Sequence, residues 1–309
     1  MRYGKKRPHN RWKLLLLALV WLGLSPAWGA ATPTSMRVVI VFDNSGSVRA
    51  SDPSRLSMTA AELFLDLARA QDVVGLVAFS NAATPLVPLT PLAQPSTRER
   101  LRTQLRSFKF TGQTTNLASA LEAGLASCPV RDDRQRDLVL LLTDGKLDLG
   151  RHRRAEEPAA LDRIRQRLLP EYRRRGIALY TIAFTADADQ GLLQEMAQAS
   201  AGEFRFIKSA TALHQAFLQL FVLANQAEAV PFKQGAFLLD PSIRAVSLVL
   251  PKHDPQEQIT LRTPQQTRLP ARTPSPGVTW STTPMYDLVR LAEPEPGPWH
   301  VRRGSTRWC

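Results

Sequence analysis

The feature that most constrains the fold is a series of short, continuously apolar runs. Each run is bounded by polar or turn residues, and they occur at 38–42, 73–79, 138–142 and 177–184. Apolar runs without alternation are typical of strands that are buried on both faces, as in a parallel sheet. Segments with leucines at helical spacing lie between or after them, at 55–70, 117–127, 161–172 and 187–200. The alternation predicts an α/β fold with a doubly wound, mostly parallel sheet.

The end of this α/β region is expected to contain one more strand and one more helix. The strand is predicted at 202–207 and the helix at about 211–223. Within the helix predicted at 161–172, Pro170 must kink or shorten the helix, because proline lacks the backbone N–H and clashes with the preceding turn. We place the α/β domain at 31–230.

The character of the sequence changes after about residue 232. Short strand-like segments are separated by Pro-rich turns, and no helical period of any length occurs there. This pattern predicts a β-rich, Pro-rich region at 235–309 that resembles the start of a β-sandwich. About 75 residues are few for a full sandwich, so we expect a short or truncated one.

The first thirty residues have the pattern of a secretory signal peptide. Six basic residues precede or flank an apolar run at 14–24, which is followed by Pro26 and small residues near Ala27, Gly29 and Ala31. We expect cleavage near 29–31 and an exported protein of the periplasm, cell envelope or extracellular space. The alternative is an uncleaved anchor, although the run is shorter than the roughly 20 residues of a spanning helix.

Charge and cysteine content exclude several classes of function. Without residues 1–30 the chain has 34 basic and 27 acidic residues, and much of the excess lies at 151–154 and 163–176. No aromatic residues interleave these basic stretches, so we interpret them as solvated helix faces and expect no nucleic-acid partner. Cys128 and Cys309 are the only cysteines. They form no Cys-x-x-Cys or Cys/His cluster, so zinc and thiol chemistry are not supported, and a disulfide between two such distant positions is not expected.

Three segments place oxygen-bearing side chains at one edge of the predicted sheet. The run at 38–42 ends in Asp43, followed by Ser45 and Ser47, and the run at 138–142 ends shortly before Asp144. The loop before the helix at 117–127 contains Thr114 and Thr115. Because the carboxyl ends of parallel strands meet at one edge, two carboxylates and three hydroxyls are expected to converge. These are hard ligands suited to Mg²⁺, Mn²⁺ or Ca²⁺, whereas the alternative is that they only cap turns.

The Asp43-x-Ser45-x-Ser47 motif, the loop threonine and Asp144-Gly145 together resemble the von Willebrand factor A domain family, over roughly residues 36–226. That resemblance implies a metal-ion-dependent adhesion site in which Ser45, Ser47 and Thr115 coordinate Mg²⁺ or Mn²⁺, with Ca²⁺ also compatible. Asp43 and Asp144 would hold the ion largely through bound water. In this family an Asp or Glu of a protein partner usually completes the coordination. Thr115 matches the family position better than Thr114.

The function expected from these residues is metal-dependent binding of an acidic residue on an unknown protein partner. One alternative is a scaffold subunit of an envelope complex that binds its partner without metal. A metal-assisted hydrolase is the other. We expect no enzymatic activity, because Ser45 occupies the position where phosphatases of related pattern carry a second Asp as general acid, and no Gly-x-Ser-x-Gly elbow occurs. Membrane attachment remains open, through an uncleaved N-terminal segment or through sequence beyond residue 309.

Overall fold

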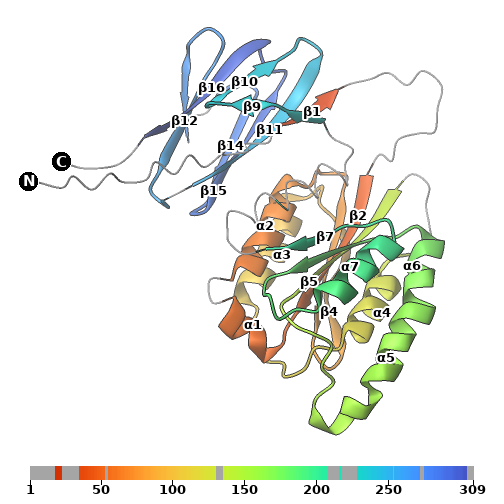
Figure 1. The fold of residues 1–309 in the computed structure, drawn as a ribbon. Helices are drawn as coiled ribbons and strands as arrows, with labels where there is room; N and C mark the ends of the chain where they lie inside the picture. The colour runs from red at the N-terminus through yellow and green to blue at the C-terminus, as the bar shows by residue number, and fades with distance from the viewer. Residues whose placement is uncertain are drawn as a thin grey trace, which may run out of the picture. The chain divides into compact units, whose positions relative to one another are not determined.

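The computed structural model describes residues 18–22, 35–52, 55–129, 135–207, 216, 228–252, 254–271 and 275–304. The chain divides into two compact units. The first, here called the α/β unit, comprises Leu24–Ala227, and the second, the β-sandwich unit, comprises Met1–Gly23 together with Glu228–Cys309. Figure 1 shows that the helices belong to the former and that the latter is built of strands.

The α/β unit is built on a six-stranded sheet. Its strands are β2 (Ser35–Asp43), β3 (Val73–Phe79), β4 (Ala83–Pro91), β5 (Gln135–Thr143), β6 (Ala178–Ala183) and β7 (Phe204–Phe206), in the spatial order β4-β3-β2-β5-β6-β7. All neighbouring pairs are parallel except β3 and β4. Every residue of β2 is buried, as expected for a central strand that is covered on both faces. The predicted doubly wound, mostly parallel sheet is confirmed.

Helices cover both faces of this sheet (Figure 1). One side carries α1 (Gly46–Ser51), α2 (Leu56–Leu67) and α3 (Pro95–Ser107). The other carries α4 (Leu117–Ser127), α5 (Glu157–Arg163), α6 (Leu169–Arg175) and α7 (Gln190–Ala199). Sequence reasoning missed β4 and α3. Three prolines in β4 disfavour a strand, and α3 buries only Thr97, Leu101 and Leu105, so its apolar stripe is narrow.

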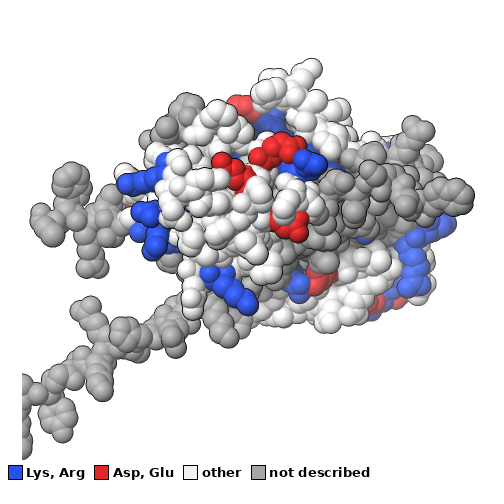
Figure 2. Space-filling view, turned by 90° about the horizontal axis from the view of Figure 1, so that it is seen from above, with Lys and Arg blue, Asp and Glu red and all other residues white. Residues whose placement is uncertain are grey.

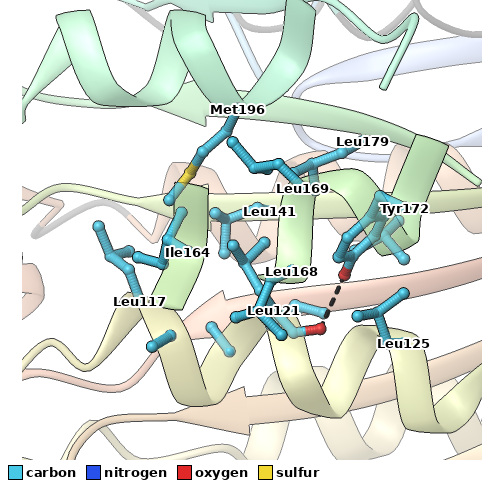
Figure 3. Packing of buried hydrophobic residues seen from close by; sticks show 14 of the residues in the cluster. Leu117, Leu121, Leu125, Leu141, Ile164, Leu168, Leu169, Tyr172, Leu179 and Met196 are labelled. Carbon is cyan, nitrogen blue, oxygen red and sulfur yellow. Dashed lines mark hydrogen bonds between the residues drawn. The ribbon is translucent and has the colours of Figure 1, made fainter. Parts of the chain in front are cut away.

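Pro170 does not shorten its helix, contrary to one of the two predicted outcomes. The helical path continues from α5 through a π-helical stretch at Ile164–Leu168 into α6, where Pro170 lies in the first turn. A widened turn before a proline accommodates the missing N–H without ending the helix. The helix then packs on α4, and the hydroxyl of Tyr172 donates a 2.9 Å hydrogen bond to the carbonyl of Leu121 (Figure 3).

The basic stretches lie on solvated helix faces, as predicted. The 3₁₀ helix Arg151–Glu156 has no buried residue. Arg165 pairs with Glu195, and Arg174 pairs with Glu171. Cys128 is a free, buried thiol, and Cys309 lies outside the described residues. The final helix predicted at 211–223 also falls on residues that the structure does not describe, apart from residue 216.

The β-sandwich unit contains two five-stranded antiparallel sheets. The first has the order β14-β15-β11-β1-β8 and the second β13-β12-β16-β10-β9. The bounds of these strands are β1 (Ala18–Leu22), β8 (Glu228–Val230), β9 (Phe232–Lys233), β10 (Ala236–Leu239), β11 (Ile243–Pro251), β12 (Gln258–Arg262), β13 (Arg268–Pro270), β14 (Val278–Thr282), β15 (Tyr286–Ala292) and β16 (Gly297–Gly304). Both sheets share one core, with Leu248 and Val289 from the first and Leu261 and Trp299 from the second.

Residues 18–22, inside the predicted signal peptide, form β1 of the first sheet. They pair antiparallel with β11 on one side and with β8 on the other. The β-rich unit therefore draws on the N-terminal segment as well as on residues from 228 onward. Cleavage near 29–31 concerns processing of the chain and stays a prediction. Among the described helices, none is long and apolar enough to cross a bilayer.

Candidate metal centre

The candidate site lies at the carboxyl ends of two adjacent parallel strands. Asp43 is the last residue of β2, and Asp144 directly follows β5. The two strands pair in register with Phe42 opposite Leu142, which sets both carboxylates at the same edge of the sheet. Asp43 and Asp144 are each 3% exposed. The buried strands thus bring together the two acidic residues that the sequence places 101 positions apart.

The turn after β2 carries the two serines toward Asp144. The backbone N–H of Ser45 donates to Oδ1 of Asp43 at 2.8 Å, which holds the turn, and Ser45 precedes α1 as its N-cap. The hydroxyls of Ser45 and Ser47 lie 2.9 Å apart. The Ser47 hydroxyl in turn donates to Oδ1 of Asp144 at 3.1 Å. Four of the five predicted residues therefore form one hydrogen-bonded set.

Thr115, in the loop before α4, lies next to Gly145, the residue that follows Asp144. Its backbone N–H donates to the carbonyl of Asp148 at 2.8 Å, and the N–H of Asp148 donates back at 3.1 Å. A Cβ built on Gly145 would lie 3.3 Å from Oγ1 of Thr115, so the threonine hydroxyl packs directly against the residue that follows Asp144. The hydroxyl of Thr114 lies 3.4 Å from the hydroxyl of Ser80, which also donates to the Thr114 carbonyl. Thr115 therefore lies against the segment that carries Asp144, whereas Thr114 contacts Ser80.

Two hydroxyl residues that sequence reasoning missed hold the carboxylates. Thr143 donates to Oδ2 of Asp43 at 2.6 Å, and Ser51 donates to Oδ2 of Asp144. The signal for Ser51 was its position four residues after Ser47, which puts both on one face of a helix. Thr143 follows Leu142, which pairs with Phe42, so its place beside Asp43 depends on the register of the sheet.

Asn44 and Ser80 fix the threonine loop against the sheet edge. The side-chain oxygen of Asn44 accepts the N–H of Thr111 at 2.9 Å, and its carbonyl accepts the N–H of Gly112 at 2.9 Å. A Cβ on Gly112 would lie 2.3 Å from the Ser80 hydroxyl, so only glycine permits this approach. Asn116 caps α4 by accepting the N–H of Ser119 at 3.1 Å.

The two carboxylates of the site have hydrogen-bond donors but no basic partner among the described residues. No described Lys or Arg side chain forms an ion pair with Asp43 or Asp144. Burial raises the pKa of Asp43 from 3.8 to about 6, the hydrogen bonds from Thr143 and Ser45 oppose that rise, and the charge of Asp144 adds to it. A cation beside both carboxylates would remove this penalty.

The donor set is compatible with a hard divalent ion only if hydroxyls take part. Within the described residues, no group of three or more His, Cys, Asp or Glu side chains lies together in a way that could hold a metal. Two carboxylates next to the hydroxyls of Ser45, Ser47 and Thr115 supply oxygen ligands alone, which suit Mg²⁺, Mn²⁺ or Ca²⁺ rather than zinc or copper. The residues present therefore fit a hydroxyl-rich site for a hard cation.

Two solved structures have a similar fold. A von Willebrand factor type A protein from Catenulispora acidiphila is 17% identical with a TM-score of 0.50, and the match covers 86% of this chain and 57% of that chain. The pilus adhesin SpaC from Lactobacillus rhamnosus GG is 15% identical with a TM-score of 0.52, covering 86% of this chain and 39% of that one. This chain thus spans only part of the length of either protein. No curated protein matches the sequence.

The family assignment comes from the sequence itself. Residues 38–219 match the von Willebrand factor type A domain family, and this span contains all five residues predicted to bind metal. It also covers most of β2, the strands from β3 to β7 and the helices on both faces of the sheet. Since the matched span covers more than half of the chain, the chain belongs to the von Willebrand factor type A domain family.

Proposed function

We propose that the chain is a divalent-cation-dependent module that binds other proteins. The observation that carries this proposal is the pair of buried carboxylates, Asp43 and Asp144, which no described basic side chain neutralises and which three hydroxyls adjoin. Such a pair is unfavourable unless a cation or a proton compensates it. The Ser47 hydroxyl donates a hydrogen bond to the Asp144 carboxylate. A cation bound between them would replace this hydrogen bond, and both side chains would become ligands of the ion.

The residues that would hold the cation are Ser45, Ser47 and Thr115 through their hydroxyls, and Asp43 and Asp144 through their carboxylates. The ion would be Mg²⁺ or Mn²⁺, with Ca²⁺ also compatible. Hydroxyls neutralise less charge than carboxylates do, so the bound ion would keep a strong attraction for another anionic ligand. An Asp or Glu carboxylate on a protein partner is the ligand that this chemistry favours.

Family membership and fold support partner binding rather than catalysis. One similar structure is named a pilus adhesin. At position 45 a hydroxyl replaces the second carboxylate that would act as general acid in a phosphatase of related pattern. The proposal therefore includes no enzymatic activity, and it places the protein outside the cytoplasm, as its N-terminal sequence predicts. The competing proposals are a scaffold subunit that needs no metal and a metal-assisted hydrolase.

Calorimetric titration of Mg²⁺ and of Mn²⁺ into the full chain tests the proposal. We expect saturable binding in the wild type and its loss in Asp43→Ala and Asp144→Ala. Asp162→Ala is the matched control, because Asp162 is an exposed carboxylate on α5 of the same unit. The folding of each variant is checked by circular dichroism.

The outcomes separate the hypotheses. Saturable binding that persists in both aspartate variants would mean that a cation binds elsewhere. No saturable binding by the folded wild type would leave the metal-independent scaffold as the better account. Hydrolysis of a phosphate or ester substrate that depends on the added cation and on Asp43 would instead favour the enzyme.

A further inference from the structure

The solvent-facing side of one sheet in the β-sandwich unit carries several basic residues. In the sheet β13-β12-β16-β10-β9, alternate residues such as Leu261 and Trp299 point into the core. Successive strand residues point to opposite faces, so their neighbours Arg262 and His300 lie on the outer face. None of the five strands contains an Asp or a Glu.

The register of the strands aligns the basic residues in one row. Lys233 pairs with Ala236, Ala236 with His300, His300 with Arg262, and Arg262 with Arg268. Arg302 lies two residues from His300 on β16 and therefore on the same face. Like charges directly opposite each other, such as Arg262 and Arg268, destabilise a sheet. An anion bound over the row would offset that repulsion.

A small pocket opens among these arginines. Its volume is 180 Å³, and its lining includes Gln258, Thr260, Arg262, Arg268, Arg302 and Arg303. Thr260 lies between Pro270 and Arg302 in the register and is 9% exposed, so it forms the floor of the pocket. The pocket is smaller than the 300 Å³ or more that is usual for drug-sized ligands. Its size and lining fit a small anion or the headgroup of a larger molecule.

Three of the four arginines have guanidinium groups available to such a ligand. Arg303 is held by the carboxylate of Glu257 at 3.1 Å and by the carbonyl of Pro251 at 2.7 Å. Arg262, Arg268 and Arg302 are exposed, and among the described residues no carboxylate pairs with any of them. In Figure 2, groups of basic side chains without acidic neighbours are visible on the described surface.

We propose that this pocket binds a phosphate group. Guanidinium groups from three strands approach the pocket, and each can donate two parallel hydrogen bonds to an oxyanion. A phosphate offers more acceptor oxygens and more charge than a single carboxylate, so it satisfies donors that come from several sides. The phosphate belongs either to a free anion or to a lipid headgroup. This site lies in a different unit from the candidate metal centre and is independent of it.

The test measures binding of three probes to the full chain by calorimetry and vesicle sedimentation. Inorganic pyrophosphate represents the free anion, acetate represents a carboxylate, and vesicles of phosphatidylglycerol are compared with vesicles of phosphatidylcholine. All are measured at the same ionic strength of about 0.15 M, because exposed charges are screened by salt. The variant is Arg262→Gln with Arg268→Gln. The matched control is Arg244→Gln, an exposed arginine on β11 whose partner is Glu293.

The proposal is supported if the wild type binds pyrophosphate, or binds phosphatidylglycerol vesicles and not phosphatidylcholine vesicles. This binding should weaken at least about tenfold in the double variant and stay unchanged in the control, because the variant removes charged hydrogen-bond donors from two strands. Which probe binds identifies the source of the phosphate. The double variant should fold, because it removes a like-charge pair from the surface. Failure of the folded wild type to bind any phosphate probe, equal binding of acetate, or equal loss in Arg244→Gln would overturn the proposal.

Discussion

Replacing Asp43 by Asn should stabilise the cation-free α/β unit at neutral pH. The folded-state pKa of about 6 lies above the ordinary value of 3.8, so the folded protein holds the charged carboxylate less favourably than the unfolded chain does. At about 1.4 kcal/mol for each pKa unit, ionised Asp43 lowers the free energy of unfolding by about 3 kcal/mol at neutral pH. An Asn retains an oxygen for the N–H of Ser45, and its amide can donate to Thr143. We therefore expect a gain of about 1–3 kcal/mol.

The pH dependence gives the sign of the effect. Because the pKa of Asp43 is raised on folding, the native state binds more protons than the unfolded state between about pH 4 and pH 6. Asp43 is therefore protonated and does not lower the free energy of unfolding below about pH 4. Its ionisation lowers that free energy as the pH rises through about 6. The Asn variant has no such titration. The two proteins should be equally stable near pH 4 and differ most near pH 7.

Urea unfolding in the presence of a chelator measures this difference. All described helices lie in the α/β unit, so circular dichroism at 222 nm reports the unfolding of this unit. No tryptophan lies within 35–207, so tryptophan fluorescence reports on other parts of the chain. Asp162→Asn serves as the control for removing a carboxylate. Equal stability of Asp43→Asn and wild type near pH 7, with both folded, would refute the reasoning. Adding Mg²⁺ should then stabilise the wild type alone, by about 2.7 kcal/mol at a hundredfold excess over Kd.

Three further perturbations follow from particular contacts. Gly112→Ala should lower the free energy of unfolding by about 1–3 kcal/mol through overpacking against Ser80, as measured by urea titration. A loss of Mg²⁺ affinity is also expected, because the threonine loop shifts. Unchanged stability would show that the loop can move to make room for the added methyl group. Tyr172→Phe removes the buried hydrogen bond from the tyrosine hydroxyl to the Leu121 carbonyl of α4. Urea unfolding should show a loss of about 0.5–1.5 kcal/mol in the free energy of unfolding, whereas an unchanged free energy would mean that this bond contributes nothing to stability. Burial raises the pKa of Cys128 to about 12. In a Cys309→Ser chain, a thiol reagent at about pH 8 should therefore label Cys128 only after unfolding. Rapid labelling of the folded protein would contradict the burial of Cys128.

The parts of the fold that could be predicted are those that local pattern determines. Continuous apolar runs identify β2, β3, β5 and β6, and parallel strands bring their carboxyl ends to one edge whatever else the chain does. Asp43 and Asp144 follow from that rule alone. Thr143 and Ser51 could not be assigned as partners in the same way, because their roles depend on register and side-chain direction. Likewise Asn44 and Ser80 act through a loop whose path no periodicity specifies.

The β-sandwich unit shows a second limit of prediction. Its strands β8, β9, β13 and β14 are five residues or fewer, too short for alternation to be recognised. The pairing of β1 with β8 and β11 joins segments more than 200 residues apart. Such contacts depend on the global topology, which the sequence pattern of either segment does not contain.

The two ends of the central sheet bear on how this domain avoids self-association. A free strand edge offers a row of backbone donors and acceptors to any other chain. At one edge, β4 carries Pro85, Pro88 and Pro91, each of which lacks an N–H, and at the other edge β7 is only three residues long. A second copy adding a strand at either side would find few hydrogen bonds to make. Strand addition at these two edges is therefore unfavourable, which removes one common route to self-association of the domain.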